Sequence, residues 1–364
     1  MSKRVISIKQ KYDTCQLTWV LNNICTNHCD YCPPILHSGT NHHYDWAIAK
    51  TFLHRLFDRY PQIHCTISGG EPTLSPHFSE LVKMFHDRGH TVGITSNAAR
   101  TVRFWEEVSP MLSYICFSYH ASFHDEEFLD KVLVAAKHTP VTIRVMMDSR
   151  HWDRSVEMFN TCYNSPSLSV EAVKILAETS MRSGVGEEYT PEQLDWLASQ
   201  RLKSATKCLY VKDNPKWKEA KIDSNVYYDD GSVDMSIDTN HLVATGQTDF
   251  RGWACNIGLE SLFVHWDGYV KKGNCLQGNN LFHLDDHTKH QLPTSGEICL
   301  QNLCSCGTDI LITKAAMLDK DHPYVTQNQQ IRPIFDDKQY KEAFYDENEQ
   351  VIGAKKVIRI VKDE

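Results

Sequence analysis

Between about residues 14 and 180, short apolar or β-branched runs alternate with longer segments of helical periodicity. The runs predict six strands, at 16–21, 64–68, 91–95, 114–118, 141–147 and 168–176. Helices are predicted between them, at 44–60, 75–88, 125–138 and 153–163. Such alternation is typical of a parallel sheet with helices outside it, and six units are too few for a closed eight-stranded barrel. The pattern therefore predicts an α/β fold, either a partial (β/α)6 TIM-like barrel or an open sheet, with ligands at the carboxyl ends of the strands.

The alternation weakens after residue 180, which suggests three parts. We expect a core domain at 14–180, a connector at 181–250, and a small cysteine-rich domain with a polar tail at 251–364. The connector holds a helix candidate near 191–204 and is a candidate cover for the active site. The tail ends in a candidate strand at 355–361.

Charge and apolar content limit the partners of this chain. Its formal net charge of -8 disfavours broad contact with phosphate backbones, so we expect no nucleic-acid partner. No stretch approaches the ~18 apolar residues of a membrane span, so we expect no membrane partner. The first ten residues lack the features of a signal peptide, and we expect a cytoplasmic location. In a reducing compartment, clustered cysteines more often bind metal or do chemistry than form disulfides.

The first cysteine group is Cys25, Cys29 and Cys32, with the spacing Cys-x3-Cys-x2-Cys. A [4Fe–4S] cluster usually takes four cysteines, so three leave one iron open. An open coordination position marks a catalytic rather than a structural metal. A zinc site is the alternative, with a fourth ligand from one of the nearby histidines His28, His37, His42 and His43.

This spacing, with the aromatic Tyr31 before the third cysteine, resembles the radical S-adenosylmethionine (SAM) superfamily over most of the first 180 residues. The resemblance implies a [4Fe–4S] cluster whose open iron binds the amino and carboxylate groups of SAM, with Tyr31 among the cofactor-binding residues. Reductive cleavage would give methionine and a 5′-deoxyadenosyl radical, which abstracts a substrate hydrogen. An electron donor such as flavodoxin or ferredoxin is implied as a partner.

Two further motifs follow strands in the order that the family shows. Gly69, Gly70 and Glu71 come after the second predicted strand and are similar to the Gly-Gly-Glu motif that holds the SAM amino group. On its own this motif is more typical of a plain strand-to-helix turn, and its position after the cysteine group favours the cofactor-binding role. Ser96 and Asn97 match the polar pair of a Thr-Asn-Gly motif after the third strand, where Ala98 departs from the pattern and puts the local backbone shape in doubt.

Three single residues are weaker candidates. Ser118 is similar to a family serine that contacts the SAM ribose or carboxylate, and Arg144 is a candidate partner of that carboxylate. His120 is a candidate catalytic proton shuttle because it follows a strand end. A structural role is the alternative for each.

The second cysteine group contains Cys255, Cys275, Cys299, Cys304 and Cys306. Asp267-Gly268 predicts a hairpin that brings Cys255 and Cys275 together. Five thiols allow a fully ligated [4Fe–4S] cluster with one left over, or a four-cysteine zinc site. The order resembles the twitch or SPASM-type extension of radical SAM enzymes, whose auxiliary [4Fe–4S] cluster transfers electrons or positions substrate. Which of the last three cysteines are ligands stays open at this point.

The sequence thus predicts a radical SAM oxidoreductase or modifying enzyme that acts on a small molecule (sugar or nucleoside-like) or a peptide. The alternative is a non-catalytic zinc-binding interaction protein, which would be colourless and indifferent to SAM. Modification of RNA is disfavoured by the charge balance.

Overall fold

The computed structural model describes residues 3–32, 36–39, 44–123, 125–165, 167–175, 188–200, 222–237, 239–304 and 306–328. The chain divides into two compact units made of discontinuous segments. The first unit contains residues 1–21, 42–66 and 221–332, and the second contains 22–41, 67–220 and 333–364. The strand predicted at 355–361 lies outside the described residues.

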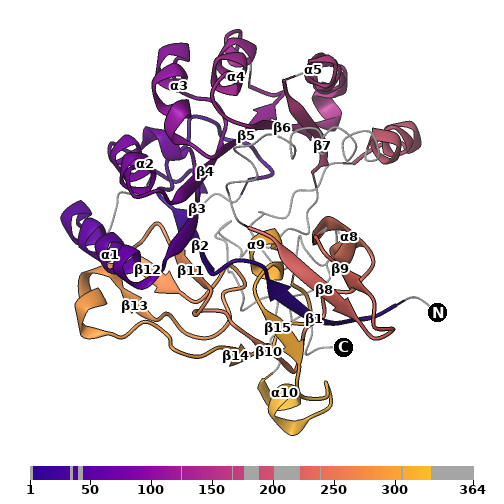
Figure 1. The fold of residues 1–364 in the computed structure, drawn as a ribbon. Coiled ribbons are helices and arrows are strands. Elements are labelled where there is room, and N and C mark those ends of the chain that lie inside the picture. Colours follow the sequence, from indigo (N-terminus) through magenta and orange to yellow (C-terminus); the bar gives the residue numbers. More distant parts are fainter. Residues whose placement is uncertain are drawn as a thin grey trace, which may run out of the picture. The chain divides into compact units, whose positions relative to one another are not determined.

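The second unit contains a parallel sheet in the order β4-β5-β6-β7. Its strands are β4 (Thr91–Ser96), β5 (Tyr114–His120), β6 (Val141–Met147) and β7 (Ser169–Lys174). Four helices lie along one face of these strands (Figure 1): α2 (Phe78–Asp87), α3 (Val102–Val108), α4 (Phe128–Ala136) and α5 (Trp152–Asn164). Short 3-10 turns occur at Pro72–Leu74, Ser109–Met111 and Ser149–His151.

Ring packing shows which face of this sheet the helices cover. Phe117 of β5 contacts Trp105 of α3 and Phe128 of α4, with ring centroids 4.7 and 6.3 Å apart. Because side chains alternate along a strand, Ser118 and His120 point to the opposite face. That face, near the carboxyl ends of the strands, is where an α/β fold places its ligands.

The first unit holds the remaining strands. In one sheet, β2 (Thr14–Val20) adjoins β3 (Gln62–Ser68) and pairs in parallel with β11 (Ser261–Val264). That sheet continues to β12 (Tyr269–Lys271) and β13 (Phe282–His283). The other sheet has the order β14-β10-β15-β1-β8-β9. Its strands are β14 (Glu297–Ile298), β10 (Trp253–Cys255), β15 (Lys314–Ala316), β1 (Val5–Gln10), β8 (Ser224–Tyr228) and β9 (Val233–Asp234).

The helices of the first unit are mostly short. They are α1 (Trp46–Arg59), α8 (Thr239–Ala244), a 3-10 helix at Leu284–Lys289, α9 (Gly307–Ile310) and α10 (Pro323–Asn328). Only α1 has the length and amphipathic spacing that sequence periodicity detects, with Asp45 capping its start through Ala47 N.

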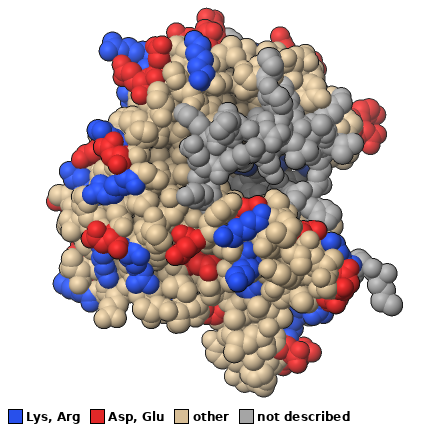
Figure 2. Space-filling model, viewed as in Figure 1, with Lys and Arg blue, Asp and Glu red and all other residues tan. Residues whose placement is uncertain are grey.

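The predicted α/β class with parallel strands is confirmed. The hairpin predicted at Asp267-Gly268 joins β11 to β12, and Gly268 has the positive φ of 87° that such a turn favours. Of the helix predicted near 191–204, residues 191–200 are helical and the rest lies outside the described residues. Among the described helices, none is long and apolar enough to cross a membrane. On the face drawn in Figure 2, acidic and basic side chains of the described residues are interspersed.

Candidate active site

The three cysteines of the first group lie together in the second unit. Cys29 is only 6% exposed, and its thiol interacts electrostatically with both Cys25 and Cys32. The Cys32 amide closes the loop by donating to the Cys29 carbonyl at 3.0 Å. Burial raises the pKa of Cys29 to about 12 and also raises that of Cys25. Neutral thiols are therefore the stable form here, and a bound cation or cluster is what stabilises thiolates.

The two glycines of the Gly-Gly-Glu motif permit a close approach of the cysteine loop. A Cβ at Gly69 would lie 2.4 Å from the carbonyl oxygen of Asn22, and one at Gly70 would lie 2.3 Å from that of Ile24. The Gly70 amide donates to Asn22 O at 3.0 Å, and the Glu71 amide donates to Ile24 O at 2.6 Å. The backbone that leads into Cys25 is thus fixed against the glycines, which no residue with a side chain would allow.

The Glu71 carboxylate is fully buried and has several hydrogen-bond donors around it. It accepts from the amide and hydroxyl of Thr73 at 3.0 and 2.6 Å, from the Ser96 hydroxyl at 2.9 Å, and from the Asn97 amide at 2.7 Å. Burial raises the pKa of Glu71, and these hydrogen bonds oppose the rise. Glu71 therefore ties the Gly-Gly-Glu turn to the end of β4. Its contact with the SAM amino group stays a prediction.

Asn97 follows β4 and reaches the cysteine loop. Its side-chain nitrogen Nδ2 donates to the Cys25 sulfur at 3.5 Å and to the Thr26 hydroxyl at 3.2 Å. Its carbonyl oxygen Oδ1 is buried with no hydrogen-bond partner among the described residues, so it can accept a bond from a ligand. Ala98, which departs from the family's glycine, still has the left-handed φ of 63° that a glycine would favour.

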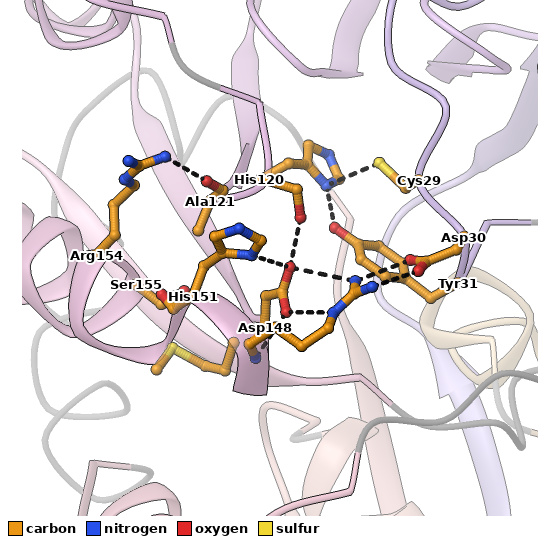
Figure 3. Close-up of polar contacts among 12 residues, drawn as sticks. Cys29, Asp30, Tyr31, His120, Ala121, Asp148, His151, Arg154 and Ser155 are labelled. Atoms are coloured by element: carbon orange, nitrogen blue, oxygen red, sulfur yellow. Dashed lines mark hydrogen bonds and ion pairs between the residues drawn. The ribbon is translucent and has the colours of Figure 1, made fainter.

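His120 lies between a thiol and a phenol (Figure 3). Its Nδ1 is 2.5 Å from the Tyr31 hydroxyl and 3.5 Å from the Cys29 sulfur. Burial lowers the pKa of His120 to about 4, so the ring is neutral near pH 7. The structure thus brings together Cys29, Tyr31 and His120, and the catalytic role of His120 stays a prediction.

Ser118 and Arg144 lie side by side on the face opposite the helices, because the β5–β6 register pairs them directly. The Arg144 side chain is 49% exposed, and its Nε donates to Glu171 of β7 at 3.0 Å. Contacts of either residue with SAM stay predictions.

Sequence analysis missed a charged group at the end of β6. Asp148 is fully buried and accepts from Ser122, Arg150 and His151. Burial alone would raise the pKa of Asp148, but these hydrogen bonds hold it below its usual range. The available signal was its position directly after a predicted strand, where functional polar residues gather.

Four cysteines of the second group line one small cavity of the first unit. They are Cys255, Cys275, Cys299 and Cys304, all buried, and Cys306 is not among the lining residues. Burial raises the pKa of Cys255, Cys299 and Cys304, and the ammonium of Lys314 in the same cavity opposes the rise. Lys314 is held by donation to three backbone carbonyls, those of Asp309, Ile310 and Ile312.

The chemistry of both thiol sets fits a metal site, and four buried thiols are the donor set of a fully ligated cluster or of a structural zinc. Within the described part of the chain, no group of three or more His, Cys, Asp or Glu side chains is already spaced to hold a metal ion. His42 and His43, two candidates for a zinc ligand, lie outside the described residues. His28 and His37 are described, and their Nδ1 atoms lie 3.4 Å from each other.

Comparison with known families adds to this geometry. Residues 19–164 match the family model described as the Radical SAM superfamily. The chain contains a radical SAM domain. The matched segment includes the first cysteine group, the Gly-Gly-Glu motif and the whole of β4–β6. Enzymes of this superfamily use a [4Fe–4S] cluster and SAM, which the radical SAM domain therefore implies as its cofactors.

Solved structures also resemble the chain. SuiB from Streptococcus suis bound to S-adenosylmethionine has 13% identity and a TM-score of 0.45, with 75% of this chain and 65% of SuiB covered. The structure titled native anSMEcpe with bound AdoMet and Cp18Cys peptide has 15% identity and a TM-score of 0.45, with 76% of this chain and 78% of anSMEcpe covered. The chain thus spans just under two thirds of the length of SuiB. No curated protein matches the chain.

Proposed function

We propose that this chain is a radical SAM enzyme in which Cys25, Cys29 and Cys32 hold a [4Fe–4S] cluster. The observation that carries the proposal is the position of these three interacting thiols within the segment 19–164 that matches the superfamily. When bound, the cluster supplies the electron that cleaves SAM reductively to methionine and a 5′-deoxyadenosyl radical, which abstracts a hydrogen atom from the substrate.

The polar residues around the loop have separate tasks in this proposal. Asn97 donates to the Cys25 sulfur and presents its unpartnered Oδ1 to the SAM ammonium group. Glu71 holds the Asn97 backbone in place through its buried carboxylate. Ser118 and Arg144, on the face of the sheet opposite the helices, bind the polar end of SAM. His120, neutral near pH 7, fixes Tyr31 and borders Cys29.

The second group serves an auxiliary [4Fe–4S] cluster for electron transfer or substrate positioning. Cys255, Cys275, Cys299 and Cys304 are its four ligands, because these four line one cavity, and Cys306 is the thiol left over. The buried ammonium of Lys314 in that cavity favours a negatively charged group such as a fully thiolate-ligated cluster. A four-cysteine zinc site carries the same formal charge and is the competing assignment.

The proposed substrate is a small molecule or a peptide, and the electron donor is a flavodoxin or ferredoxin. Mass spectrometry of the 5′-deoxyadenosine that forms with deuterated small molecules or deuterated peptides as candidate substrates would separate the two substrate classes. Transfer of substrate hydrogen into 5′-deoxyadenosine identifies the molecule that the radical attacks.

Iron and sulfide content of protein purified without oxygen tests the proposal. The protein should be brown and contain about eight irons per chain, and a variant with Cys25, Cys29 and Cys32 all changed to Ala should lose about four. About four irons confined to the first group would leave the enzyme assignment intact and make the second site zinc or empty. Colourless protein that contains only zinc would support the zinc-binding interaction protein and refute the enzyme.

A further inference from the structure

A bidentate ion pair joins the cysteine loop to the end of β6. Asp30 lies directly after Cys29, and its two carboxylate oxygens accept from the two terminal nitrogens of Arg150 at 2.7 and 3.1 Å. These residues are 120 positions apart in the chain, so the pair is a tertiary contact within the second unit. A guanidinium that binds both oxygens of one carboxylate fixes orientation as well as distance.

Arg150 is itself held from behind by Asp148. The Asp148 carboxylate accepts from the backbone amide of Arg150 at 3.0 Å and from its Nε at 3.2 Å. Asp148 has no exposed side-chain surface, whereas the Arg150 and Asp30 side chains are 51% and 49% exposed. The buried carboxylate thus orients the Arg150 side chain, which begins just after β6 and ends on the cysteine loop.

The further partners of Asp148 make this arrangement specific. Ser122 and His151 also donate to its Oδ2, so its position is fixed from the β5 end and from the start of α5. The Nε, Nη1 and Nη2 nitrogens of Arg150 are all directed at Asp148 or Asp30. Three charged residues therefore form a chain from a buried anchor to the residue that follows Cys29.

We propose that Arg150, oriented by the buried Asp148, is a positioning residue that holds the cysteine loop in its cluster-binding arrangement through Asp30. The inference rests on the proposed function, since it assigns the loop to a cluster. The Asp30–Arg150 ion pair would hold the cysteine loop in place before the cluster binds, without the participation of any cysteine. A variant without this ion pair keeps all three cysteines, but its cysteine loop is less ordered.

Hydrogen exchange of iron-free protein, followed by mass spectrometry, tests the arrangement without any cofactor. The variants are Arg150→Gln, Asp30→Asn and the double variant. Arg154→Gln is the matched control, because Arg154 lies one helical turn further on and donates to the Ala121 carbonyl rather than to the loop. Amides of residues 25–32 should exchange about five to ten times faster in each single variant, with no further increase in the double variant.

The same proteins, reconstituted with iron and sulfide without oxygen, give a second readout. Iron loss to a chelator should be about five to ten times faster in Arg150→Gln and Asp30→Asn than in the wild type, with Arg154→Gln unchanged. Arg150→Lys keeps the charge but not the paired contact, so its rate of iron loss should lie between those of Arg150→Gln and the wild type. Unchanged exchange and iron loss in both single variants, or additive effects in the double variant, would overturn the proposal.

Failure of the proposed function has a different signature. In that case the wild type takes up no iron, while the exchange measurements on iron-free protein still decide whether Arg150 holds the loop. Urea midpoints within error of the wild type for every variant show that the fold as a whole is intact.

Discussion

Replacing Glu71 with Gln should destabilise the iron-free fold more than its small change in shape suggests. The Glu71 carboxylate accepts from two backbone amides, those of Thr73 and Asn97, and from the hydroxyls of Thr73 and Ser96. A glutamine has one acceptor oxygen in place of two, and its amide nitrogen can only donate. One backbone N–H therefore loses its acceptor whichever way the amide is turned.

The size of the effect follows from the burial of this group. The better orientation keeps the oxygen at the position that accepts from both the amide and the hydroxyl of Thr73. The new amide nitrogen then takes the other position, where the Ser96 hydroxyl, 2.9 and 3.0 Å from the two present oxygens, can turn to accept from it. The backbone N–H of Asn97, which now donates to a Glu71 carboxylate oxygen at 2.7 Å, would then face the N–H2 group of the glutamine, which is also a donor. A buried donor without a partner costs about 1–3 kcal/mol, and the lost contact is to a charged group, so we expect a loss of about 2–4 kcal/mol.

Urea unfolding of the iron-free protein measures this loss without interference from a cofactor. Glu106→Gln on the exposed side of α3 is the matched control, since it makes the same chemical change at the surface and should shift stability by less than about 0.5 kcal/mol. A loss for Glu71→Gln as small as that of the control would refute the reasoning. It would mean that the carboxyl group does not accept from both backbone amides.

Three further changes test other parts of the structure. Cys304→Ser should lose the auxiliary iron, about four atoms per chain, whereas Cys306→Ser should keep it, as metal analysis of both proteins would show. Burial lowers the pKa of His64 to about 4, so the stability that its neutral ring contributes is present above the unfolded pKa of about 6.5 and is lost as pH falls. The free energy of unfolding in urea should fall by about 2 kcal/mol between pH 7 and pH 5 through this group, and His64→Gln should remove that part of the fall. Gly70→Ala should displace the cysteine loop and lower iron uptake at least severalfold, whereas Gly89→Ala, at a positive φ but in open space, should cost only about 1 kcal/mol and leave iron uptake unchanged. Equal iron content in the two cysteine variants, or normal iron uptake by Gly70→Ala, would contradict the corresponding assignment.

The sequence was a good guide to elements whose signal is local. The strand predicted at 141–147 has those bounds in the structure, because its β-branched and apolar residues form a short buried run. In contrast, β1 was missed. Its six residues pair with β8 and β15, more than 200 positions later in the chain, and such pairing leaves no mark in the sequence around Val5–Gln10. The short helix α3 was missed because its seven residues give too few turns for a periodic pattern.

The same division holds for the site. Spacing selected Cys25, Cys29 and Cys32 as candidate ligands, because three cysteines within eight residues can reach one cluster, and the structure places their thiols within electrostatic reach of one another. Nothing in the spacing indicated that Asp30 meets Arg150, since that contact depends on where the end of β6 lies relative to the loop. Likewise the spacing did not indicate that Cys304 lines the cavity of the first unit whereas Cys306 does not, because the directions of two cysteines so close in sequence depend on the folded backbone.

The polar residues of the first site differ in how many of their hydrogen-bonding positions are occupied, and this difference separates scaffold from binding surface. The Glu71 carboxylate already accepts from four donor groups, so its effect on a ligand acts mainly through the backbone that it holds. Asn97 is the opposite case, because one end of its amide is fixed to the cysteine loop while its buried Oδ1 has no partner among the described residues. A buried acceptor without a donor costs free energy until a ligand provides one. We therefore propose that Glu71 acts mainly by holding the backbone of the site, whereas Asn97, which it contacts, has an acceptor oxygen left for a ligand.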